Sequence, residues 1–93
     1  MPPRRSVGSA YGSRYREFLH LLRAARRRAG LTQIDVARAL NRPQSFVAKC
    51  ESGERRMDII ELDEFARLYA CPIAVFIPRR DAGTRHRQAP RAR

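Results

Sequence analysis

Signals that begin and end helices recur at short intervals along this chain. Thr32 and Asp58 can each cap the start of a helix, and each is followed three positions later by an acidic residue, which is a capping-box pattern. Gly30 and Gly53 can end helices because glycine adopts the left-handed conformation without a steric penalty. Helices bounded by such closely spaced signals are short. The sequence therefore predicts an all-α fold built from several short helices.

Apolar residues recur at helical spacing between these signals. Asn41 tolerates the left-handed conformation and is expected to end the second helix, and Pro43 suits the start of the third because no backbone N–H is needed there. The residue before Pro72 is pushed away from helical geometry, so the fourth helix is expected to end near Ala70. The predicted helices cover approximately residues 14–29, 32–40, 43–52 and 58–70.

The last apolar run, Ile73-Ala74-Val75-Phe76-Ile77, is ambiguous. Its β-branched residues favour a strand, but a single strand would have no partner in an otherwise helical chain. We therefore expect a short fifth helix after Pro72, which gives a compact five-helix bundle. One short helix cannot turn all of its large apolar side chains into one small core, so Ile73, Phe76 and Ile77 are predicted to form a dimer interface.

Positive charge is concentrated at the two ends of the chain. The formal net charge is +11, from 20 basic and nine acidic residues. Residues 1–30 carry eight arginines and residues 79–93 carry six, against one acidic residue in each stretch. We therefore divide the chain into a flexible basic arm (1–13), a folded domain (14–78) and a disordered basic tail (79–93). The excess of arginine indicates a polyanionic partner, with nucleic acid as the first candidate.

Two short helices joined by a tight turn at Leu40-Asn41-Arg42-Pro43 describe a helix-turn-helix. The chain from Leu31 to Gly53 contains the pattern Leu31-Thr32-Gln33, Val36-Ala37, Leu40, Val47, Glu51 and Gly53. In this pattern it resembles the Cro/repressor-type helix-turn-helix family of bacterial and phage DNA-binding proteins, the xenobiotic-response-element-like regulators. The resemblance extends over roughly residues 14–78 and departs from the usual family pattern at Asn41, Pro43 and Cys50. It implies a lambda-repressor-like fold that binds double-stranded DNA.

The resemblance also implies which residues contact DNA. The third helix enters the major groove, which accepts one α-helix, and its outward side chains read base edges. Glutamine suits adenine, lysine suits guanine and serine suits several bases. Phe46 is assigned to the DNA backbone, although its ring could instead contact a thymine methyl group or lie partly inside the protein. The predicted base-contacting residues are Gln44, Ser45 and Lys49, and the predicted backbone-contacting residues are Gln33, Arg42, Phe46, Ser52, Arg55 and Arg56.

Arg26 and Glu51 occupy positions that form an ion pair between helices in several family members. The planar guanidinium group of arginine can engage a carboxylate with two hydrogen bonds. By this resemblance, the pair is predicted to fix the third helix against the first.

Other patterns that could indicate catalysis or metal binding receive no support. His20 and His86 have no cysteine or second histidine at metal-ligand spacing, so no metal site is predicted. The carboxylates between positions 58 and 64 are expected to cap a helix and face solvent. Cys50 and Cys71 are interpreted as small apolar residues, with a redox-sensing disulfide as the alternative. We predict no enzyme activity, catalytic residue, cofactor, secretory signal or membrane span.

These observations predict a cytoplasmic transcriptional regulator of bacterial or phage type. The preferred interpretation is a repressor that binds a pseudo-palindromic operator as a homodimer, because one module makes few base contacts. Two alternatives stay open. The chain could be the antitoxin of a toxin–antitoxin pair, which binds a partner protein and represses its own genes. It could also bind nucleic acid without sequence preference, through its arginine-rich ends.

Overall fold

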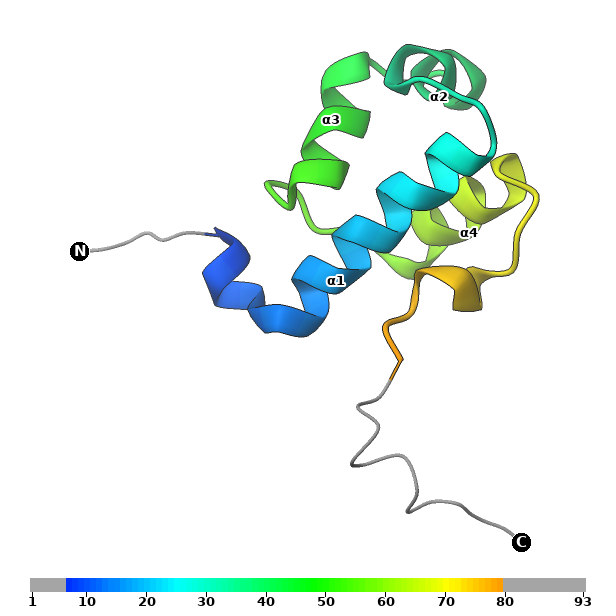
Figure 1. Cartoon of the computed structure of the whole chain (residues 1–93). Coiled ribbons are helices and arrows are strands. Elements are labelled where there is room, and N and C mark those ends of the chain that lie inside the picture. The colour runs from blue at the N-terminus through cyan, green and yellow to red at the C-terminus, as the bar shows by residue number, and fades with distance from the viewer. Residues whose placement is uncertain (1–6, 80–93) are drawn as a thin grey trace, which may run out of the picture.

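Four α-helices and one 3-10 helix make up residues 7–79, the part of the chain that the computed structural model describes (Figure 1). None of these residues forms a strand, so the all-helical prediction is confirmed. Residues 1–6 of the predicted arm and 80–93 of the predicted tail, including His86, lie outside the described residues. The elements are α1 (Val7–Arg28), α2 (Gln33–Leu40), α3 (Gln44–Ser52), α4 (Ile59–Leu68) and the 3-10 helix Ile73–Phe76.

Helix α1 begins before the predicted first helix. It starts at Val7 and bends at Gly12, whose φ of 79° and ψ of −176° are not helical. From Ser13 onward it follows the predicted register. Its last turn carries Arg26, Arg27 and Arg28, and positive charge is favourable there because the carbonyl end of a helix is partially negative.

Two reciprocal capping boxes fix the starts of α2 and α4, as the sequence predicts. The backbone N–H of Asp35 donates to the Thr32 hydroxyl at 3.1 Å, and the Thr32 N–H donates to the Asp35 carboxylate at 2.9 Å. At α4, the Glu61 N–H donates to Asp58 at 2.8 Å and the Asp58 N–H donates to Glu61 at 3.1 Å. Each box satisfies backbone donors that the first turn of a helix otherwise leaves without partners.

Helices α2 and α4 end in left-handed residues other than glycine. Asn41 has φ of 58°, as predicted, and the N–H of the following residue donates to the carbonyl of Ala37. Ala70 has φ of 56°, and the Cys71 N–H donates to the carbonyl of Ala66 at 3.0 Å. This second end is a Schellman motif built on alanine, which the sequence does not reveal because alanine rarely adopts that conformation.

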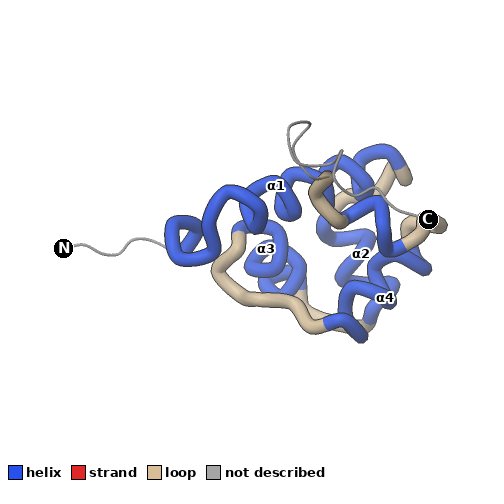
Figure 2. Tube along the Cα trace, turned by 90° about the horizontal axis from the view of Figure 1, so that it is seen from below, coloured by secondary structure: helices blue, strands red, loops and turns tan. Residues whose placement is uncertain are grey.

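All five elements contribute to one hydrophobic core. Helix α1 packs against α3 and the 3-10 helix, while α2 packs against α3 and α4. Figure 2 shows α1 along one side of the domain, with α2, α3 and α4 gathered on its other side. The buried apolar residues are Phe18, Leu19, Leu22, Ala25, Val36, Ala37, Val47, Cys50, Phe65, Ala66, Tyr69 and Phe76.

The last apolar run forms one turn of 3-10 helix, so the described residues contain four α-helices rather than five. Phe76 is 0% exposed, and its ring meets that of Tyr69 edge-on at 6.3 Å between centroids. The predicted role of Phe76 in a dimer interface is therefore wrong, because the core of a single chain already contains this side chain. Ile77 is 49% exposed and Ile73 is half-buried, so these two residues retain accessible apolar surface.

Gly53 is the position where the fold most needs glycine. Its φ is 86°, and an added Cβ would lie 2.8 Å from Cδ1 of Leu19. We expect Gly53→Ala to lower the free energy of unfolding by about 2–4 kcal/mol, because left-handed strain and overpacking add. Denaturant unfolding measures this loss.

Gly30→Ala is the matched control. Gly30 has a similar φ of 77°, but an added Cβ there would meet nothing within 4 Å. It should cost only the left-handed strain, about 1–2 kcal/mol. Equal losses in the two variants would show that Leu19 accommodates the extra carbon.

Candidate nucleic-acid interface

Helices α2 and α3 are joined by a three-residue turn. The left-handed conformation of Asn41 reverses the chain, and the Arg42 N–H bonds back to α2 at 2.9 Å. Pro43 has an extended ψ of 153° and precedes the first residue of α3 without a side-chain cap. This geometry is a helix-turn-helix. It leaves the backbone N–H groups at the start of α3 without a side-chain partner from the N-cap residue.

Helix α3 has one buried side and one exposed side. Val47, Cys50 and Glu51 are buried. The three predicted base-contacting residues, Gln44, Ser45 and Lys49, are all exposed. The helix therefore presents amide, hydroxyl and ammonium groups to solvent while its other side is anchored in the core.

Glu51 is the charged residue on which this anchor depends. It is 1% exposed, and burying a carboxylate is costly unless partners replace its hydration. Arg26 donates from Nε to Oε2 at 2.7 Å and from Nη2 to Oε1 at 3.2 Å. Its hydrogen bond to Glu51 raises the pKa of Arg26, which favours the charged form of the guanidinium group. The structure thus brings together the two residues expected to form an ion pair, and it ties α3 to α1.

Gln33 extends this network from α3 to α2. Its Nε2 donates to Glu51 Oε1 at 3.0 Å, and its Oε1 accepts from Gln44 Nε2 at 3.4 Å. The sequence suggested Gln33 only as a phosphate contact. In the structure its amide also links the buried carboxylate to a predicted base-contacting residue. No sequence signal gives this link, because it joins positions 18 and 11 residues apart.

Arg23 is a second stabilising residue that the sequence analysis missed. Its Nη1 donates to the backbone carbonyl of Glu51 at 2.6 Å. Arg26 in turn donates from Nη1 to the carbonyl of Leu31 at 2.9 Å, at the entry to α2. The two arginines therefore satisfy carbonyl oxygens near the end of α3 and before the start of α2. Their spacing of three residues on one helix is the signal that could have indicated a shared role.

Two of the predicted backbone-contacting residues lie over the aromatic ring of a third, Phe46. The guanidinium carbons of Arg42 and Arg55 lie 4.5 and 4.8 Å from the centroid of the Phe46 ring. Phe46 is half-buried, and its ring centroid lies 6.3 Å from that of the core residue Phe65. Its ring is therefore partly inside the protein and partly covered by two cations, as in a cation–π contact.

Both of these arginines also meet carboxylates of α4. Arg55 donates to the two oxygens of Glu61 at 2.8 Å each, and these bonds lower the pKa of Glu61. Arg42 lies 3.7 Å from Glu64, and both of those side chains are more than one-third exposed. Arg42 is thus the more loosely held of the two and the better placed to turn toward a phosphate.

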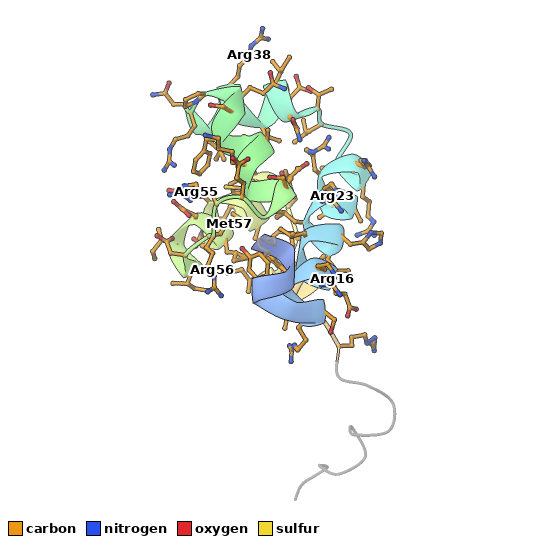
Figure 3. The ribbon with its side chains drawn as sticks, turned by 90° about the vertical axis from the view of Figure 1, so that its left-hand side faces the viewer. Arg16, Arg23, Arg38, Arg55, Arg56 and Met57 are labelled. Carbon is orange, nitrogen blue, oxygen red and sulfur yellow. The ribbon has the colours of Figure 1, made fainter. Side chains whose placement is uncertain are left out.

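Ser52 and Arg56 complete the predicted set. The Ser52 hydroxyl donates to the carbonyl of Lys49 and accepts from the N–H of Glu54, each at 3.2 Å, so it helps to end α3. The guanidinium of Arg56 lies 5.4 Å from the ring centroid of Tyr15. Figure 3 shows Arg55 and Arg56 on one side of the C-terminal part of α3, and Arg16 and Arg23 along α1 on the other.

The geometry of the described residues gives little support to a metal site, a membrane span or a disulfide. Among residues 7–79, no group of three or more histidine, cysteine or acidic side chains is placed to hold a metal ion. No helix within that range is long and apolar enough to cross a membrane. Cys50 and Cys71 are free thiols, and burial raises the pKa of both.

Comparison with known proteins identifies the family. Residues 17–75 match a helix-turn-helix domain family. A solved structure described as an XRE-family like protein from Pseudomonas syringae pv. tomato str. DC3000 is 41% identical and superposes with a TM-score of 0.65, covering 76% of this chain and 89% of that one. This chain belongs to the XRE-type helix-turn-helix family. No curated protein matches it. The XRE-type resemblance inferred from sequence is therefore correct at the level of the family.

The Arg26–Glu51 pair can be tested by a double-mutant cycle in this XRE-type domain. We expect Arg26→Ala or Glu51→Ala to cost about 3–5 kcal/mol of unfolding free energy, because each leaves a charge poorly compensated in a largely buried place. The double variant should lose far less than the sum, since it leaves neither charge behind.

The matched control is the exposed pair Asp63 and Arg67 on α4, joined at 2.8 Å. Its two variants should have small effects that add, because solvent screens the pair. Additive losses at Arg26 and Glu51 would mean that those residues do not stabilise one another.

Proposed function

We propose that this chain is a sequence-specific regulator of transcription that binds double-stranded DNA and acts in the cytoplasm. In this proposal it is not an enzyme, and it represses by occupying a pseudo-palindromic operator. One observation carries the proposal. The exposed side of α3 presents Gln44, Ser45 and Lys49, while the buried Glu51 on the same helix is held by α1 and α2.

The chemistry of these three side chains suits base edges in the major groove. The Gln44 amide can pair with N6 and N7 of adenine, and the Lys49 ammonium can donate to O6 and N7 of guanine. Ser45 can donate to or accept from several bases. A rigidly held helix favours such readout, because its contacts require little ordering on binding.

Phosphate contacts would hold the register of α3 in the groove. The first turn of α2, at Gln33, offers backbone N–H groups at the positive end of a helix. Arg42, Ser52, Arg55, Arg56 and the rim of the Phe46 ring lie in the turn, in α3 and in the loop that follows it. Arg55 is engaged with Glu61 through both terminal nitrogens, so we assign the more direct role to Arg42.

The test begins with selection of bound duplexes from a random DNA pool. We expect Gln44→Ala and Lys49→Ala to relax the preferred sequence, each reducing discrimination at one base pair by about 1–3 kcal/mol. Binding to scrambled DNA should change little for Gln44→Ala. Arg67→Ala removes the same charge as Lys49→Ala from exposed α4 and should leave the preference unchanged.

If both α3 variants keep the wild-type ranking of operator variants, α3 does not read bases. If the wild-type chain itself selects no sequence, the alternative of binding without sequence preference replaces the proposal.

We also propose homodimerisation, through the apolar surface that remains at the end of the described chain. A groove of about 340 Å³ is lined by the apolar residues Leu21, Ala74, Val75 and Ile77, with the charged Glu17 and Arg79 also in its lining. The half-exposed Ile77 and the half-buried Ile73 are the interface residues that remain after Phe76 is excluded. A symmetric dimer would set two α3 helices near one DNA turn apart, about 34–36 Å.

Ile77→Glu tests the dimer. We expect the wild-type chain to sediment as a dimer and the variant as a folded monomer with weakened operator binding, because a buried carboxylate would oppose association. Ile60→Glu is the control, since Ile60 is 65% exposed on α4 outside the groove. A wild-type monomer that still protects a two-fold site would contradict the dimer. Co-purification with a small partner protein would instead support the antitoxin alternative.

A further inference from the structure

Helix α1 carries a row of basic side chains that none of the proposed contacts uses. Arg16, His20, Arg23 and Arg27 are spaced by four, three and four residues, which places them on one face of the helix. We call these four residues the α1 basic track. Arg16, His20 and Arg27 are exposed and Arg23 is half-buried.

The track borders α3. Arg23 anchors it there through the 2.6 Å bond to the carbonyl of Glu51, near the C-terminal end of α3. Figure 3 shows Arg16 and Arg23 along α1 on one side of this end of α3, opposite Arg55 and Arg56. Positive side chains therefore flank α3 on two sides, as the two phosphate strands flank the major groove.

Within α1 itself, basic residues far outnumber acidic ones, since Glu17 is the one acidic residue of the helix. Arg23 meets the backbone carbonyl of Glu51, and the carboxylate of Glu51 is paired with Arg26. Glu17 lines the groove beside Arg79 and Ile77. A row of like charges costs self-repulsion in the free protein, and a polyanion relieves that cost on binding.

The length of the track matches a stretch of DNA backbone. Positions 16 and 27 are eleven residues apart, which corresponds to about 16 Å along an α-helix. One strand of B-DNA places a phosphate every 3.4 Å along the duplex axis, so about five phosphates lie within that reach. The extended row of cations therefore matches the phosphate backbone of a duplex better than it matches a compact anion.

We propose that the α1 basic track binds the phosphate backbone of the duplex beside the groove that α3 enters. The track adds affinity without sequence information, so it acts on operator and on other DNA alike. This inference rests on the proposed binding of double-stranded DNA, but not on base readout by α3.

The experiment compares two double variants of the full chain that lose equal charge. Arg16→Gln with Arg27→Gln removes two members of the track and keeps Arg23, which holds α3. Arg28→Gln with Arg79→Gln is the control. Arg28 lies near the Cys71 thiol and Arg79 lines the groove, so neither belongs to the face of α1 that carries the track. Circular dichroism checks that both variants stay folded.

Fluorescence anisotropy then measures Kd from 50 to 200 mM salt on two 30-base-pair duplexes, one selected and one scrambled. We expect the track variant to lower the salt slope by about 1.8 on both duplexes, as for two lost phosphate contacts. When the salt rises from 50 to 200 mM, the loss of affinity should therefore be about 12-fold smaller for the track variant than for the wild type. Its preference for the selected duplex should not change, and the control should keep the wild-type slope.

The outcomes separate this inference from the proposed function. Equal slopes for the track variant and the control overturn the track. A lost preference with an unchanged slope also overturns it, because the arginines would then act through α3. If wild type shows no preference but the track variant still lowers the slope, base readout fails and the track stands. The same titration is made on a 30-base-pair RNA duplex. If the track variant lowers the salt slope on RNA but on neither DNA duplex, the track binds RNA and the proposal is overturned.

Discussion

The rest of this domain depends on how one buried carboxylate is satisfied. Glu51 is nearly inaccessible to solvent, and Arg26 of α1 and Gln33 of α2 replace the water that it loses. Because each partner comes from a different helix, satisfying the charge also fixes α3 relative to α1 and α2. The apolar core alone would hold α3 in place but specify its rotation less strictly, since hydrophobic contact is not directional. The orientation of the exposed side of α3 therefore follows from an electrostatic requirement on its buried side.

Much of the fold could be predicted from sequence because its determinants are local. The capping boxes at Thr32 and Asp58 and the left-handed end at Asn41 each involve residues within one turn of one another, and the structure confirms them. The predicted interface role of Phe76 was wrong because the burial of its side chain depends on where the last turn packs against Tyr69, which no local pattern gives. The hydrogen bond from Gln33 to Glu51 was missed for the same reason, since helix packing brings these distant positions together.

The candidate site shows a similar division. The family resemblance placed Gln44, Ser45 and Lys49 on the third helix, and the structure finds all three exposed. It did not indicate that Arg42 and Arg55 would stack on Phe46 or meet carboxylates of α4. In an arginine-rich chain, each guanidinium group can pair with acidic, aromatic or carbonyl groups, and only the folded structure determines which of these lie near it. Charge counted from sequence therefore overstates the charge that is available to a ligand.

The contact between Gln33 and Gln44 links α2 to the side chain of the first residue of α3. The Gln44 amide approaches its partner at 3.4 Å, a distance that restrains the side chain and yet leaves the bond easy to break. A restrained amide has fewer rotamers to lose when it meets a base, so part of the entropy of recognition is spent during folding. Under the proposed function, the side chain at position 33 would therefore affect how strongly Gln44 binds a base.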